Sequence, residues 1–239
     1  MGLNFAAVLG HGIEAEDLRT LPHRLSAARA PRLAEAIIEL TMRGAEYYGK
    51  RDTKQPTLDD LNEENWFVQP TRLALYRDIA GNLTSQMPPV IERKIGPNRW
   101  RGHLAPVAAW RMVSVKEYWA AGNWFDVQGY INLAIGPHAL GLSCSLRWWT
   151  FLTASAMQAA TRRVCQEVAR LFGSPLAIYV FDARTPIDAI VKGSTIEEIV
   201  AQLHAKLGRP GPALTVLDDE SMPDNGGRDT YYLDTFAGL

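Results

Sequence analysis

The sequence predicts an α+β fold: a mixed, largely antiparallel sheet with a central β-hairpin at about residues 124–147, packed against amphipathic helices. Three observations support this class. Residues 124–135 and 140–147 both alternate apolar and polar side chains with the period of two that a half-buried strand shows. Other segments repeat apolar residues at helical spacing. Strands and helices alternate only in part along the chain, which disfavours a doubly wound α/β fold.

The first part of the chain is predicted to hold one strand and then helices. Residues 3–9 are apolar and strand-like, and the acidic residues among 14–17 suit the start of a short helix that Pro22 ends. Pro31 fits the first turn of a longer helix. The N–H groups of this turn have no partner within the helix, so the N–H that proline lacks is not missed. The apolar stripe of that helix runs to Tyr47.

The hairpin is the most regular pattern in the sequence. Residues 136–139 form its turn, so that Ile135 lies opposite Leu140 and Ile131 lies opposite Cys144. A shift of one residue would expose the whole apolar face, and the pattern therefore fixes this register. The interpretation treats 124–135 as one strand, which places Asp126 diagonally opposite Arg147 on the polar face.

Helices and strands alternate again after the hairpin. A helix is expected at about 153–172, followed by a strand at 176–181 that is apolar throughout and so buried on both faces. Ser194 and Glu197 have the spacing of a capping box, which starts a helix ending before Gly208. Residues 107–119 fit helix and strand about equally well, and a helix is favoured at 116–121. Tail strands are expected at 214–217 and 231–236.

The composition is that of an ordinary globular chain. It has 239 residues, of which 47% are hydrophobic and 21% charged, and a formal net charge of −1. We expect a single α+β domain over 1–239, with a helical N-terminal subregion at 13–65 as an option. Two cysteines are too few for a disulfide scaffold, and no signal peptide or membrane span is evident, so a cytoplasmic location is expected.

The motifs that resemble catalytic or cofactor sites lack their structural context. Gly10-x-Gly12-x-x-Ala15 is not followed by the second strand and acidic residue of a dinucleotide site. Cys144 falls on the apolar face of the hairpin, and Ser143 lies within a regular strand. The five histidines form no pair at metal-binding spacing. No cofactor, metal or catalytic residue is therefore predicted.

Charge is unevenly distributed along the chain. Residues 72–116 hold eight basic side chains against two acidic ones, whereas residues 211–239 hold six acids against Arg228. The basic stretch includes a loop at 93–103 that combines cations with an aromatic ring, as phosphate-binding and base-stacking sites do. The candidate anion-binding residues are Arg93, Lys94, Arg99, Trp100 and Arg101.

The polar face of the hairpin is the second candidate site. Tyrosine, tryptophan, arginine and amide side chains gather there, and these residue types dominate the energetics of protein interfaces. Its candidate residues are Trp124, Asp126, Gln128, Tyr130 and Arg147. We therefore expect a non-catalytic protein that binds another protein, as an inhibitor or immunity-type factor for a partner enzyme. The alternative is an enzyme or binding protein for a phosphate-containing or nucleic-acid ligand, with Asp126 or Asp182 as acid or base.

Overall fold

The computed structural model describes residues 4–14, 20–50, 53–63, 66–70, 76–77, 83–84, 123–127, 131–217 and 226–236. In chain order its elements are β1 (Asn4–Gly10), α1 (Leu21–Leu25), α2 (Pro31–Tyr47), η2 (Asp59–Leu61), β2 (Trp66–Pro70), β3 (Tyr76–Arg77), β4 (Leu83–Thr84), β5 (Asn123–Val127), β6 (Ile131–Ile135), β7 (Ala139–Arg147), α6 (Trp148–Thr153), α7 (Ser155–Phe172), β8 (Leu176–Phe181), η4 (Asp182–Arg184), α8 (Ile187–Lys192), α9 (Ile196–Leu207) and β9 (Tyr231–Thr235).

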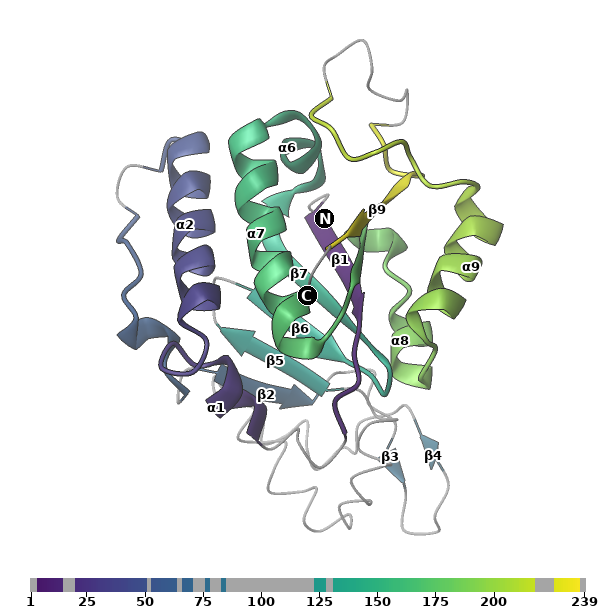
Figure 1. Ribbon diagram of the computed structural model, residues 1–239, viewed down its shortest axis with the longest axis horizontal. Coiled ribbons are helices and arrows are strands. Elements are labelled where there is room, and N and C mark those ends of the chain that lie inside the picture. The colour runs from purple at the N-terminus through teal and green to yellow at the C-terminus, as the bar shows by residue number, and fades with distance from the viewer. Residues whose placement is uncertain are drawn as a thin grey trace.

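A seven-stranded sheet organises these elements, in the order β2-β5-β6-β7-β1-β8-β9 (Figure 1). Each pair of neighbouring strands in it is antiparallel. The predicted α+β class is confirmed, as is its largely antiparallel sheet with a hairpin at the centre. A separate two-stranded ladder joins β3 to β4.

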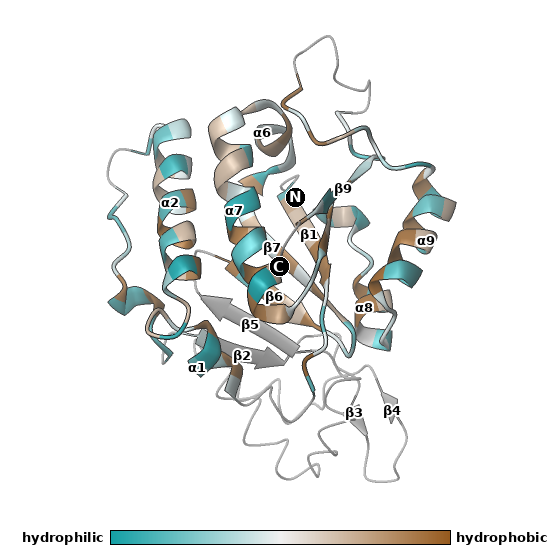
Figure 2. Cartoon of the chain, viewed as in Figure 1, coloured by the Kyte–Doolittle hydropathy of each residue, from teal (hydrophilic) through white to brown (hydrophobic). Residues whose placement is uncertain are grey.

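Strand β1 shows how the sheet divides the core, because both of its faces are buried. Phe5 and Leu9 belong to a large apolar cluster with residues of α2, α6 and α7, while Ala6 and Val8 belong to a second cluster with residues of α8 and α9. Figure 2 shows that helices α2, α7 and α9 carry both hydrophilic and hydrophobic bands, as helices packed by one face do. Helices therefore cover both faces of the sheet around β1.

The hairpin register is as predicted. Ile135 lies opposite Leu140 and Ile131 opposite Cys144. The turn is closed by the N–H of Gly136, which donates to the carbonyl of Ala139 over 2.9 Å. A β-carbon on Gly136 would lie 1.9 Å from the carbonyl oxygen of Ile190, so only glycine allows the turn to approach α8 this closely.

The prediction of one strand over 124–135 is wrong, because the chain reverses within it. Strands β5 and β6 pair with each other, Val127 opposite Ile131 and Phe125 opposite Leu133. Odd-numbered residues thus face odd-numbered residues, and the apolar alternation continues through the reversal unchanged. Periodicity alone cannot distinguish this arrangement from a single strand; Gly129 is the one local sign of a reversal in the sequence.

Three further expectations are corrected. Pro22 lies in the first turn of α1 rather than ending a helix, a position where its missing N–H costs nothing. The capping box is formed by Thr195 and Glu198, one residue later than predicted. Residues 214–217 form no strand, since their one described backbone bond, from the N–H of Leu217 to the carbonyl of Leu152, ties them to α6.

Other expectations hold or lie outside the described residues. The helices at 31–47, 155–172 and 196–207, and the strands at 4–10, 176–181 and 231–235, match the predicted elements to within a few residues. The helix expected at 116–121 lies outside the described residues, as does most of the short helix expected after residue 14.

Candidate partner-binding surface

The residues predicted on the polar face of the hairpin are separated in the structure. Trp124 and Asp126 lie in β5, Arg147 is the last residue of β7, and Gln128 and Tyr130 lie outside the described residues. The predicted anion-binding loop, Arg93, Lys94, Arg99, Trp100 and Arg101, also lies outside them, so that site stays a prediction.

The predicted diagonal contact between Asp126 and Arg147 is wrong. Asp126 lies opposite Asn132 of β6, which lies opposite Ser143 of β7. Arg147 pairs instead with Asn4 of β1, beyond the end of β6. The cause is the antiparallel pairing of β5 with β6, which places β6 between the two strands that carry these residues.

Three half-exposed aromatic residues lie near Arg147 in the fold or in the sequence. Tyr47, Tyr48 and Trp149 are 50%, 40% and 46% exposed, respectively. Tyr47 and Tyr48 meet edge to face, with ring centroids 5.1 Å apart. We call Tyr47, Tyr48, Arg147 and Trp149 the aromatic surface. It lies where the end of α2 meets the junction of β7 and α6.

Tyr48 connects the two parts of this surface. It caps the C-terminus of α2, and its N–H donates to the carbonyl of Gly44. Its hydroxyl oxygen accepts from the N–H of Arg147 over 3.3 Å and lies 3.0 Å from Oγ1 of Thr150. The ring is therefore fixed at both ends although 40% of the residue is exposed. A side chain ordered in this way loses little further entropy when it binds a partner.

Consecutive tryptophans of α6 have different roles. Trp148 is buried, stacks against Phe151, and donates from Nε1 to the carbonyl of Gly227 over 3.1 Å. Trp149 is half exposed, and a β-carbon built on Gly226 would lie 3.8 Å from its ring. Trp148 thus belongs to the core, while Trp149 remains available at the surface.

The sequence interpretation misplaced Tyr47 and did not select Tyr48. Tyr47 continues the apolar stripe of α2 and was expected to face inward, but it lies in the last turn, where its ring packs on Tyr48. A tyrosine pair followed by Gly49 at a helix end is the local signal available. Their proximity to Arg147, about a hundred residues later, is visible only in the folded chain.

A cavity of about 230 Å³ lies beside the aromatic surface, between α2 and the β6–β7 hairpin. Burial raises the pKa of the Cys144 thiol in its wall to about 11, so this side chain is neutral at physiological pH. Its described lining residues are Ile37, Leu40, Thr41, Gly44, Ala45, Tyr48, Lys50, Thr53, Ile131, Cys144, Ser145, Leu146 and Met157.

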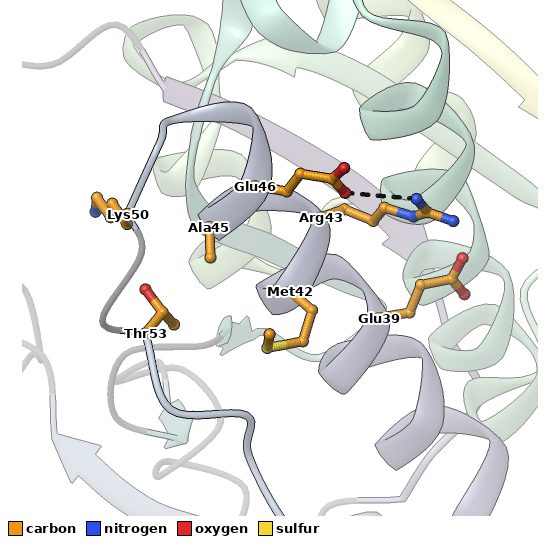
Figure 3. Close-up of a pocket in the computed structure, with 7 residues that line it drawn as sticks. All are labelled: Glu39, Met42, Arg43, Ala45, Glu46, Lys50 and Thr53. Carbon is orange, nitrogen blue, oxygen red and sulfur yellow. Dashed lines mark ion pairs between the residues drawn. The ribbon is translucent and has the colours of Figure 1, made fainter.

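A second, more open hollow adjoins the cavity (Figure 3). It shares Ala45, Lys50 and Thr53 with the cavity, and four further residues of α2 complete its lining: Glu39, Met42, Arg43 and Glu46. Arg43 and Glu46 form an ion pair of 3.6 Å within the helix. Four of the seven lining residues are charged, which suits a solvated surface more than a ligand site.

A buried polar cluster centres on Asp234. Arg162 donates to both carboxylate oxygens over 2.8 and 2.9 Å, and the Tyr179 hydroxyl donates to Oδ2 over 2.7 Å. Burial, reinforced by the neighbouring Cys165 and Asp234, raises the pKa of Tyr179 well above its usual value. Each charged group is satisfied by this geometry, which attaches β9 to α7 and β8 and fits a structural role.

His11 is also buried. Nε2 donates to the carbonyl of Gly136 over 2.8 Å, and Nδ1 accepts from the N–H of Ile13 over 3.2 Å. Burial lowers the pKa of this imidazole to about 4, and the nearby His138 acts in the same direction. The ring is neutral at pH 7 with both nitrogens paired, so it joins β1 to the hairpin turn.

The acidic tail is partly neutralised by arginines outside the basic stretch. Asp234 pairs with Arg162, and Asp229 pairs with Arg184. Asp182, the alternative acid or base, accepts from the N–H of Ala183 over 2.7 Å and caps its own turn. These contacts favour the structural interpretation of the acids that the structure describes.

The described part of the chain offers neither a metal-binding cluster nor a membrane-spanning helix. It contains no cluster of three or more His, Cys, Asp or Glu side chains able to hold a metal ion. Among the helices described there, none has the length and apolarity needed to cross a bilayer. Comparison of the chain with protein-family models, characterised proteins and solved structures gave no match.

Proposed function

We propose that this chain is a non-catalytic protein that binds another protein through the aromatic surface. The observation that carries the proposal is the half-exposed pair of Tyr47 and Tyr48, in which the Tyr48 hydroxyl accepts from the N–H of Arg147, two residues before the half-exposed Trp149. Tyrosine, tryptophan and arginine are the residue types that contribute most at protein interfaces. The proposal includes the sequence-based expectation that the partner is an enzyme and that this chain inhibits it.

Rigidity is the second support for the proposal. The backbone and hydroxyl bonds of Tyr48 hold its ring in place. Preordered aromatic anchors give affinity at low entropic cost. The contacts of Asp182, Asp234 and His11 leave those groups satisfied structurally, which agrees with a binding role.

The test is affinity capture from native cell extract, with nuclease treatment, using the wild type and two variants. The wild type should capture a stoichiometric protein partner, and the double variant Tyr47→Ser with Trp149→Ser should not. The captured partner is then purified, and its binding to the wild type and to each variant is titrated directly. Leu58→Ser is the matched control, because Leu58 is 52% exposed but lies outside the aromatic surface. Equal capture by both variants, or recovery of nucleic acid alone before nuclease, contradicts the proposal. An inhibitory role further requires that the purified partner lose activity on binding.

A further inference from the structure

The cavity between α2 and the β6–β7 hairpin has an apolar interior and a polar rim. Buried side chains from four elements form the interior: Ile37, Leu40, Ile131, Cys144, Leu146 and Met157. The exposed lining residues are Tyr48, Lys50 and Ser145, and Thr41 and Thr53 are half-buried. Such a combination orients a ligand that is apolar at one end and polar at the other.

The absence of a side chain at Gly44 helps to keep this space open. Gly44 lies inside α2, where glycine is the least favourable residue apart from proline. A β-carbon there would lie 3.7 Å from Cε of Met157, which is ordinary van der Waals contact, so neither sterics nor backbone conformation requires glycine. Helix α2 therefore carries a helix-destabilising residue at the wall of the cavity, and a larger side chain at position 44 would project into the cavity.

Size restricts the ligand to one ring or a short branched chain. The cavity measures about 230 Å³. Engineered apolar cavities of about 150 Å³ accept benzene, and pockets for drug-sized ligands begin at about 300 Å³. The available space therefore fits a single ring with a small substituent.

Charge selects the head group. Lys50 is the one charged side chain among the described residues that line the cavity, and Thr53 lies on the same rim. An ammonium group with a neighbouring hydroxyl matches a carboxylate. We propose that this cavity binds a small carboxylic acid with one apolar ring or branched chain, its apolar part beside Met157 and Cys144 and its carboxylate at Lys50. The proposal does not depend on the protein-binding function.

Benzoate and its neutral analogue benzyl alcohol are the probes for this site. In protein labelled with ¹³C at the methionine methyl groups, millimolar benzoate should shift the Met157 signal, which is assigned from its loss in Met157→Leu. Met42 lines the adjoining hollow but not the cavity, so its signal should stay in place. An unchanged Met157 signal with both probes overturns the proposal, as does an equal shift of Met42.

Variants separate the cavity from the head group. Gly44→Leu should abolish the benzoate-induced shift, while Gly44→Ala, the matched control, should retain it; circular dichroism confirms that both fold. Lys50→Gln should weaken benzoate about two- to fivefold and leave benzyl alcohol unchanged, as expected for an exposed ion pair. Benzoate binding that survives Gly44→Leu overturns the assignment to the cavity. Unaltered benzoate affinity in Lys50→Gln overturns the choice of a carboxylate.

Discussion

Individual buried polar residues attach the last strand to the rest of the fold. Asp234 accepts three hydrogen bonds, two from Arg162 and one from the buried Tyr179. Asp234→Ala leaves the Tyr179 hydroxyl unpaired in the core, and the free energy of unfolding should fall by roughly 2–3 kcal/mol. Urea denaturation measures this loss. Glu46→Gln is the control, because its exposed pair with Arg43 should contribute less than about 1 kcal/mol. Equal effects of the two substitutions would contradict a structural role for the cluster.

The buried imidazole of His11 makes stability depend on pH. Its pKa is lowered to about 4 in the folded chain, against 6.5 for an ordinary histidine, so the unfolded chain binds more protons between these values. The stability that the neutral ring provides is complete above about pH 6.5 and falls as the pH decreases towards 4, by about 3 kcal/mol in total. Urea unfolding at pH 7 and pH 4.5 should show a smaller difference for His11→Gln than for the wild type. Identical pH dependence would exclude His11 as the cause.

At the level of helices and strands, the periodicity of apolar residues predicted the hairpin register. It did not predict the reversal between β5 and β6, which leaves that periodicity unchanged. The hairpin register followed from the alternation of 131–135 with 140–144, because one apolar face excludes other registers. The reversal between β5 and β6 was missed because pairing Val127 with Ile131 preserves the alternation. Side-chain burial on α7 is likewise not encoded by periodicity alone: the polar Gln158 is buried and donates to the carbonyl of Phe151 over 3.1 Å.

The start of α9 provides a test at this scale. Two hydroxyl residues precede the helix, and the capping box uses Thr195, whose oxygen accepts from the N–H of Glu198 while the Glu198 carboxylate accepts from the N–H of Thr195. Thr195→Ala should therefore cost about 1 kcal/mol of unfolding free energy, whereas Ser194→Ala should cost only a few tenths. Chemical denaturation of both variants measures the difference. The reverse order would restore the earlier prediction, with Ser194 as the cap.

At the scale of the whole molecule, the candidate sites combine residues that are distant in the sequence. Tyr48 and Arg147 meet at the aromatic surface, and Gly44 and Cys144 line one cavity, each pair separated by about a hundred residues. No local pattern encodes such proximity, which depends on how α2 packs across the hairpin. The charge asymmetry is likewise resolved only in part: the tail acids Asp229 and Asp234 pair with Arg184 and Arg162, while most of the basic stretch lies outside the described residues.

The two helical layers should unfold together, because β1 is buried on both faces and the hairpin turn presses on α8. A β-carbon at Gly136 would lie 1.9 Å from the carbonyl oxygen of Ile190, so Gly136→Ala must displace either the turn or α8. We expect a loss of about 2 kcal/mol or more and a melting temperature lower by at least about 4 °C. Gly12→Ala is the matched control, since no atom lies within 4 Å of its β-carbon position. Far-ultraviolet circular dichroism and tryptophan fluorescence should report one shared transition, as a single domain requires. Two separate transitions in Gly136→Ala would instead show that α8 and α9 detach independently of the sheet.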